Sequence, residues 1–178
     1  MAKKGFQPVI DNNTELLILG TFPGEKSLGA EQYYADGRNA FWRLISGVIN
    51  EDITILSYKN RIEKLMQKKI GLWDVFSICE IEGSQDSEIR NSVESDFFKL
   101  KTIAPSLRTI YFNGEKPQKY AEKILTKMGY STKLLPSSSG SHAIPFDKKL
   151  NSWKAILEIS LQPRPEVRTK YKRLKDPR

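Results

Sequence analysis

The chain has 178 residues, 39% of them hydrophobic and 10% aromatic, which supports one folded domain and excludes a disordered chain. One cysteine, Cys79, and one histidine, His142, exclude an intrachain disulfide and a Cys/His cluster for a structural metal, so we expect neither metal nor cofactor. The net charge of +8 favours binding to polyanions, nucleic acid among them. Because no apolar run reaches the roughly 18 residues of a membrane span and the first residues do not form a signal peptide, we expect a cytoplasmic protein, associated with the nucleoid if prokaryotic, and no membrane contact.

The first half of the chain predicts a buried strand followed by two helices. Residues 15–20 (ELLILG) form a nearly uninterrupted apolar run that ends in glycine, as buried parallel strands do. After a Gly/Pro loop, residues 39–49 and 57–69 place their apolar side chains at helical spacing, and Gly71 marks the end of the second helix.

The second half predicts three more strands, with helices between them. The strand candidates are residues 72–79, 107–112 and 132–135, and the helix candidates are residues 95–103, 116–128 and 147–161. A polar loop is predicted over residues 82–91. This alternation predicts an α/β fold, a three-layer α/β/α sandwich around a mostly parallel four-stranded central sheet.

The composition changes at Pro163 and Pro165. We therefore expect a single domain over residues 1–161 and a basic C-terminal tail over residues 162–178. The tail has seven basic and two acidic residues, a charge of +5. It is either a segment attracted to polyanions or a merely solvated terminus.

Four polar segments follow the predicted strands. They are residues 20–27 (GTFPGEKS), the loop after Cys79, Asn113-Gly114, and residues 136–142 (PSSSGSH). Open α/β sheets bind their ligands beyond the carboxyl ends of the strands. The four segments are therefore expected along one rim of the sheet, where they would form the functional site.

Two familiar motifs do not fit this sequence. GTFPGEKS departs from the phosphate-binding pattern G-x-x-x-x-G-K-[ST], because Glu25 stands where the second glycine belongs. A Ser-His hydrolase would pair one of the loop serines with His142, but no G-x-S-x-G elbow is present.

Several residues near the expected rim have two interpretations each. Phe22 either projects into the cleft or fills the core, and Asn39 either caps a helix or grips a polar planar group. Arg38 either clamps a phosphate or forms a surface ion pair. Asp74 either accepts a proton or caps a helix or loop.

The serine-rich loop is a candidate phosphate contact. Its members are Ser137, Ser138, Ser139, Gly140 and Ser141. They offer hydroxyl and backbone donors without bulk, which phosphate binding requires, and the following Lys148 and Lys149 would add electrostatic attraction. The alternative is an ordinary flexible loop.

In their order and spacing these segments resemble the motifs of the uracil-DNA glycosylase superfamily, and most closely its hypoxanthine-DNA glycosylase branch. The matching segments are Gly20-Thr-Phe-Pro-Gly24, Ser27-Leu28, Tyr33-Tyr34, Arg38-Asn-Ala-Phe-Trp42, Gly71-Leu-Trp-Asp-Val75, Cys79-Glu80, Gly83-Ser84, Asp86, Asp96-Phe97, Phe112-Asn-Gly114 and Leu135-Pro-Ser-Ser-Ser139. The resemblance covers about residues 14–160.

The resemblance implies a metal-free enzyme that flips a deaminated nucleotide out of DNA and hydrolyses its base–sugar bond, leaving an abasic site. Asn39 would be the catalytic residue. Phe22, Tyr34, Asp74 and Asn113 would bind the base, Phe22 by stacking and Asn113 at the polar edge. The DNA backbone would contact Arg38, Ser137, Ser138, Ser139, Gly140, Ser141, His142 and Lys148. At the last motif the chain has Gly140-Ser-His-Ala143 where the family continues with Pro-Ala-Asn-Ala.

The chemistry of an asparagine suits this role. Its amide offers a donor and an acceptor but takes up no proton near neutral pH, so Asn39 would hold the attacking water or the departing base. We expect a monomer that acts on DNA with deaminated bases, hypoxanthine first and uracil second. The alternatives are a catalytically inactive nucleic-acid-binding module on the same scaffold and a hydrolase of small nucleosides.

Overall fold

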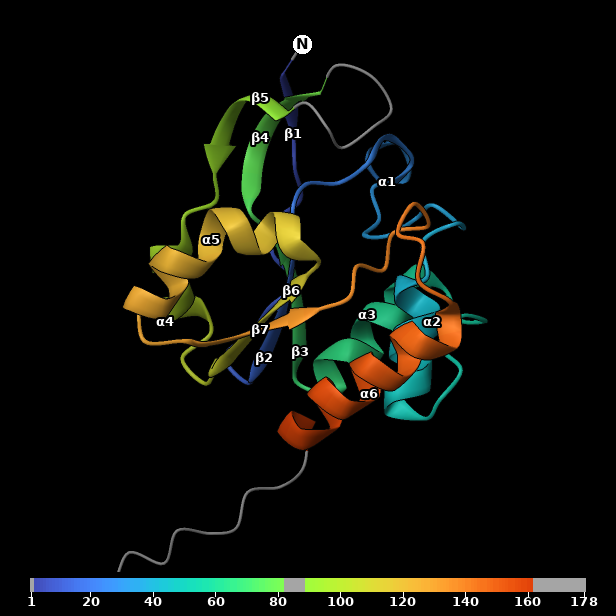
Figure 1. The fold of residues 1–178 in the computed structure, drawn as a ribbon. Helices are drawn as coiled ribbons and strands as arrows, with labels where there is room; N and C mark the ends of the chain where they lie inside the picture. Colours follow the sequence, from blue (N-terminus) through green and yellow to red (C-terminus); the bar gives the residue numbers. More distant parts are fainter. Residues whose placement is uncertain (1, 82–88, 162–178) are drawn as a thin grey trace, which may run out of the picture.

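The structure, a computed structural model, describes residues 2–81 and 89–161 and is built around a parallel sheet (Figure 1). The sheet has the order β3–β2–β6–β7 and contains β2 (Leu16–Gly20), β3 (Ile70–Asp74), β6 (Thr109–Asn113) and β7 (Ser131–Leu135). Each of the three neighbouring pairs is parallel. The predicted four-stranded central sheet is therefore confirmed.

Helices cover both faces of this sheet. Leu16 and Ile18 pack into a cluster with α2 (Phe41–Ile49), α3 (Tyr58–Gln67) and α6 (Phe146–Leu161). Leu17 and Leu19 point to the other face, where α4 (Leu100–Ile103) and α5 (Glu115–Lys127) lie. Figure 1 shows the two helix groups on opposite sides of the strands. Because both of its faces are covered, β2 is apolar along its length, and the predicted α/β/α sandwich is confirmed.

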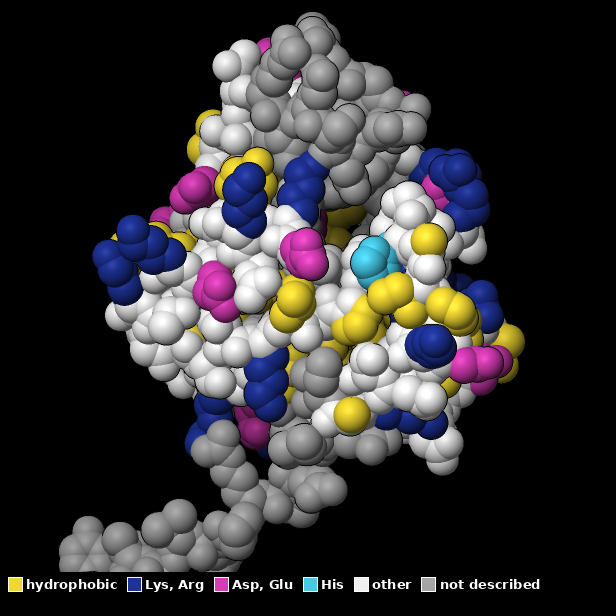
Figure 2. All heavy atoms as spheres, viewed as in Figure 1, with side chains coloured by type: hydrophobic (Ala, Val, Ile, Leu, Met, Phe, Trp, Pro, Cys, Tyr) yellow, Lys and Arg dark blue, Asp and Glu magenta, His cyan; other side chains and the backbone are white. Residues whose placement is uncertain are grey.

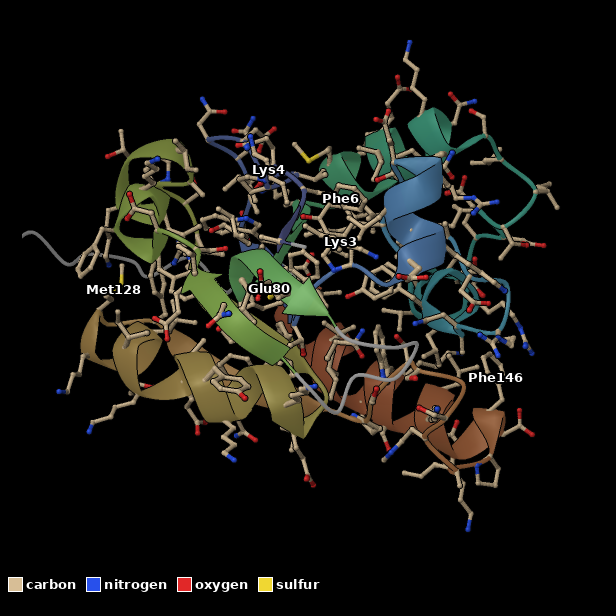
Figure 3. The ribbon with its side chains drawn as sticks, turned by 90° about the horizontal axis from the view of Figure 1, so that it is seen from above. Lys3, Lys4, Phe6, Glu80, Met128 and Phe146 are labelled. Atoms are coloured by element: carbon tan, nitrogen blue, oxygen red, sulfur yellow. The ribbon has the colours of Figure 1, made fainter. Side chains whose placement is uncertain are left out.

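A second, antiparallel sheet was not predicted. It has the order β1–β4–β5 and contains β1 (Ala2–Lys4), β4 (Phe76–Ile81) and β5 (Ile89–Glu94). In the view of Figure 3, Lys3, Lys4 and Glu80 lie on this sheet, well away from Phe146 at the start of α6.

The second sheet corrects two predictions. The strand predicted over residues 72–79 is two strands, because β3 ends at Asp74 and Phe76 begins β4 in the other sheet. The loop predicted over residues 82–91 overlaps β5, and residues 82–88 lie outside the described part of the chain.

Smaller differences concern the helices. A short helix, α1 (Glu25–Ala30), lies within the predicted Gly/Pro loop. The helix predicted over residues 95–103 is a 3₁₀ turn, η1 (Phe97–Lys99), followed by α4. The predicted basic tail, residues 162–178, lies outside the described residues. Among the described helices none has the length and hydropathy that crossing a bilayer requires.

Candidate active site

The four parallel strands end at one edge of the sheet. Three of the four predicted segments follow these strands, but the loop after Cys79 does not, because Cys79 lies in β4 of the antiparallel sheet. The register pairs Gly20 of β2 with Asp74 of β3, and Asn113 of β6 with Leu135 of β7. Since parallel strands share their direction, the segments that follow these residues start from the same rim. The structure therefore places residues from four distant parts of the sequence at one edge.

Gly20 lets two polar side chains approach the end of β2. A Cβ atom at position 20 would lie 2.4 Å from Asp74 Oδ1 and 3.1 Å from the Tyr34 hydroxyl. Any larger side chain would displace the Asp74 carboxyl group. Gly20 is thus a site residue that the sequence analysis did not select, although a glycine at the end of a buried strand signals such close approach.

Asp74 is a buried acid with an unsatisfied oxygen. The residue is 5% exposed, and within the described part of the chain its Oδ2 atom has no hydrogen-bond partner. Burial disfavours the charged form and raises the pKa of Asp74 to about 7. Below neutral pH the group is therefore largely a neutral carboxylic acid with a proton to donate. No cap formed by its side chain is found in the described structure.

Tyr34 has an unusual backbone conformation. Its φ of 55° lies in the left-handed region, which a bulky residue adopts only when its surroundings hold it there. Its ring stacks on Phe41 of α2 with a centroid distance of 3.8 Å, and its hydroxyl accepts a hydrogen bond from Asn113 Nδ2 at 3.1 Å. The stacking and this hydrogen bond offset the strain and fix the phenol beside Asp74.

Asn113 connects the end of β6 to the serine-rich loop. Its Nδ2 group donates to the Tyr34 hydroxyl and, at 2.8 Å, to Ser138 Oγ, while its Oδ1 accepts the Ser138 N–H at 2.8 Å. Both amide hydrogens are thus used within the protein. In this arrangement Asn113 holds the loop and keeps one lone pair of Oδ1, and its place at the polar edge of a base stays a prediction.

Residues 137–142, which we term the serine turn, follow β7. Ser139 O accepts the His142 N–H at 3.2 Å, and the Ser139 and Ser141 hydroxyls are 2.8 Å apart. Ser137 Oγ accepts the Ser139 N–H, and Ser137 packs against Gly114. The turn is therefore ordered by its own hydrogen bonds, unlike the flexible loop of the alternative interpretation.

Ser138, predicted to contact the DNA backbone, is instead buried inside the protein. The residue is fully buried, and its N–H and hydroxyl are bonded to Asn113. Its carbonyl accepts the Ala40 N–H at 2.9 Å. Because it has no exposed surface, Ser138 supports the turn and does not contact DNA directly. Of the predicted loop contacts, Gly140, Ser141 and His142 are exposed, and Ser139 is half-buried.

Asn39 lies directly beside the serine turn. Its neighbour Ala40 is bonded to Ser138, and a Cβ atom at Gly140 would lie 2.7 Å from the carbonyl oxygen of Arg38. The half-buried Asn39 accepts the Phe41 N–H at 3.0 Å with its Oδ1 atom. Ala40, and not Asn39, is the N-cap of α2, but the bond from Asn39 Oδ1 to the first residue of the helix fixes the amide plane and leaves Nδ2 as a donor. That Asn39 grips a polar planar group stays a prediction.

The other predicted residues lie on the surface or in the core. Arg38 forms an ion pair with Asp36 at 2.8 Å, which holds the pKa of that carboxyl group well below its usual range. Lys148 is exposed. Phe22 is half-buried, packs against the cluster under α5 and lies against Gly5. Its role in stacking on a base stays a prediction.

The surface near the serine turn is hollowed. Figure 2 shows the histidine side chain (cyan) beside a depression with hydrophobic atoms on its floor. In the described part of the chain, no group of three or more His, Cys, Asp or Glu side chains is arranged to hold a metal ion. What the rim offers instead is an amide, a buried acid, a phenol and exposed hydroxyls.

Comparisons with known proteins agree with this arrangement. Residues 7–159 match the model of the uracil DNA glycosylase superfamily. A hypoxanthine DNA glycosylase from Methanosarcina barkeri is 46% identical over 153 residues, covering 86% of this chain and 96% of that protein. A protein of the same name from Methanosarcina acetivorans is 44% identical over 156 residues, covering 88% of this chain and 98% of the relative.

A solved structure gives the same result for the fold. The solution NMR structure of a candidate uracil DNA glycosylase from Methanosarcina acetivorans superposes with a TM-score of 0.81 at 43% identity, covering 89% of this chain and 98% of that one. The predicted resemblance is thereby confirmed over most of the chain. This chain belongs to the uracil DNA glycosylase superfamily.

Proposed function

We propose that this chain is a monofunctional DNA glycosylase that removes deaminated bases from DNA, hypoxanthine first and uracil second, and leaves an abasic site. The observation that carries the proposal is the contact between the Asn39 segment and the serine turn at the rim of the sheet. The names of the two Methanosarcina relatives, both called hypoxanthine DNA glycosylase, support this choice of base.

The reaction is a hydrolysis. The bond between C1′ of the deoxyribose and the base nitrogen breaks, and its electron pair leaves with the base. Positive charge develops on the sugar and negative charge on the base. Water then adds to C1′, and the proton that it loses neutralises the departed base. Fixed donors aimed at the developing negative charge stabilise this transition state, each by about 3–4 kcal/mol in comparable sites.

Asn39 is the proposed catalytic residue. Its Oδ1 is oriented by the Phe41 N–H, so the amide needs no reorganisation during the reaction. The Nδ2 group donates to the leaving base, and the second lone pair of Oδ1 is an acceptor for the attacking water. Because an amide takes up no proton at neutral pH, Asn39 favours a path in which the base leaves before water attacks.

Asp74 is the residue that we propose recognises the base through a hydrogen bond. Hypoxanthine presents carbonyl and ring-nitrogen acceptors, and a buried neutral acid is a donor that fits them. Within the described residues Asp74 Oδ2 has no hydrogen-bond partner, which supports this role. Tyr34 would line the same place, and Phe22 would supply the stacking surface.

The exposed part of the serine turn is proposed to contact the DNA backbone. Ser139, Gly140 and Ser141 offer hydroxyl and N–H groups without bulk, and Arg38 and Lys148 add positive charge. Extruding a base costs a few kcal/mol, least at a mismatched or damaged pair, so this step already favours deaminated sites.

The test is a base-release assay on three duplexes, which carry deoxyinosine, deoxyuridine or no lesion. The protein is incubated with each duplex in the presence of a chelator, and abasic sites are then cleaved with hot alkali. We expect strand scission at deoxyinosine, weaker scission at deoxyuridine and none in the undamaged duplex.

Three results would contradict the proposal. Gel retardation of all three duplexes without scission would favour the inactive binding module. Turnover of free nucleosides with no preference for DNA would favour a nucleoside hydrolase. Scission only in the absence of chelator would overturn the metal-free mechanism.

A further inference from the structure

Lys149 is a lysine buried beneath the serine turn. It lies in the first turn of α6 and is 4% exposed, whereas its neighbour Lys148 is exposed. Its Nζ atom donates to the carbonyl oxygen of Ser139 at 3.0 Å. Lysines are almost never this buried without a charged partner, so the position calls for an explanation.

The surroundings of Lys149 do not compensate its charge. Among the described residues, no carboxylate lies within ion-pair distance of its Nζ atom. The start of a helix favours negative charge, so the first turn of α6 is an unfavourable place for a cation. Burial also lowers the pKa of Lys149. A buried cation whose one described partner is a carbonyl oxygen destabilises the fold unless an anion joins it.

Helix α6 holds the serine turn at two points. Lys149 binds the Ser139 carbonyl, and Trp153, one turn further along the helix, donates its Nε1–H to the carbonyl of Pro136 at 2.9 Å. The Ser139 carbonyl also accepts the His142 N–H that closes the turn. Lys149 therefore fixes the same peptide group whose neighbouring hydroxyls, those of Ser139 and Ser141, lie near the surface.

We propose that Lys149 supplies the buried positive charge of a phosphodiester-binding site at the serine turn, which Trp153 holds on α6. The inference rests on the proposed function in one respect, namely that the anion is the backbone of DNA. The ion binds at the turn hydroxyls, and the charge of Lys149 attracts it through the Ser139 peptide. Trp153 provides the second, uncharged anchor.

The test compares Lys149→Met, Lys149→Arg and Lys127→Met with the wild type. Lys127 is the matched control, because it is an exposed lysine near the end of α5. The affinity of each protein for a duplex with a stable abasic-site analogue is measured at several KCl concentrations. One lost phosphate contact lowers the slope of log K against log salt by about 1 and weakens binding by roughly ten-fold. We expect the reduced slope and weaker binding for Lys149→Met. Lys149→Arg should recover the wild-type slope, and Lys127→Met should leave both the slope and the affinity unchanged.

A second measurement separates charge from misfolding. The indole N–H resonance of Trp153 reports whether the turn stays on α6, and we expect it to be unchanged in Lys149→Met. A wild-type slope in Lys149→Met overturns the proposal. So does a reduced slope that Lys149→Arg does not restore, or one accompanied by a shifted Trp153 resonance, because these results indicate a structural role alone. The slopes are measured without catalysis, so a wild type that binds DNA but releases no base would defeat the proposed function and leave this comparison valid.

Discussion

At the scale of single residues, Asn39 and Asp74 differ in how their polar atoms are satisfied. Asn39 Oδ1 is bonded to the backbone at the start of α2, which fixes the orientation of the amide. Asp74 Oδ2 has no partner in the described structure, and desolvation raises the pKa of the group to about 7. The Asn39 amide is thus preorganised by its hydrogen bond, and the neutral Asp74 carboxyl group has a proton that it can donate.

The raised pKa of Asp74 predicts a pH-dependent stability. The folded protein holds this proton up to about pH 7, whereas an unfolded Asp loses it near its ordinary value of 3.8. The folded state therefore binds more protons in that window, and stability falls as the pH rises from about 4 to above 7. Asp74→Asn removes this loss, so we expect it to raise Tm by on the order of 5 °C relative to the wild type at pH 8.

The control is the same pair of proteins at pH 3, below the ordinary pKa of 3.8, where the wild-type acid is largely neutral in both states and the gain in Tm should shrink to near zero. The difference in Tm between the two proteins is measured at each pH by thermal unfolding, monitored by circular dichroism. An equal change in Tm at the two pH values would show that Asp74 is not a buried acid with a raised pKa.

At the scale of elements, the site depends on contacts between segments that are distant in sequence. The segment before α2 and the serine turn before α6 touch through Ala40–Ser138 and Arg38–Gly140. Gly140 permits this contact because a Cβ atom there would lie 2.7 Å from a backbone oxygen, which cannot rotate away as a side chain can. The absence of a side chain at Gly140 therefore sets the distance between the segment of Asn39 and the serine turn.

We expect Gly140→Ala to lower the rate of base release by at least about ten-fold, because the turn must move away from Asn39. The loss of stability should stay within about 1–3 kcal/mol, the usual cost of overpacking. Gly29→Ala is the matched control, since Gly29 lies in α1 with no atom within 4 Å of its added Cβ. Single-turnover rates and thermal unfolding of both variants check this, and a wild-type rate in Gly140→Ala would contradict the proposed contact.

The elements that the sequence predicted well are those whose pattern is set by burial on both faces. The apolar run of β2 is one example, because its residues 16–19 each pack into one of the two core clusters. The break after Asp74 was missed, since apolar residues continue from β3 into β4 although the chain moves to another sheet. Burial of Ser138 and Lys149 could not be predicted, because serine in a Gly/Ser-rich segment is typical of an exposed loop and lysine is typical of a solvated helix face.

At the scale of the whole molecule, the parallel sheet brings the strand ends together and the helices hold the loops that follow. Packing of α2, α3 and α6 on one face and α4 and α5 on the other leaves the rim for chemistry (Figure 1). Lysine and arginine side chains are spread over the face in Figure 2, in agreement with the net charge of +8. Such a charge increases the encounter rate with DNA, whereas we propose that the rim residues select among bases.

The most direct test of this account is the single-turnover release of hypoxanthine by Asn39→Ala, with binding of the same duplex measured alongside. Loss of one preorganised donor predicts release slower by about 100-fold or more, and binding within a few-fold of the wild type. Asn39→Ser retains an acceptor for the Phe41 N–H at the start of α2 and should be equally slow with wild-type Tm, which separates catalysis from this structural bond. Release by Asn39→Ala at the wild-type rate would contradict the central claim that this amide acts on the departing base.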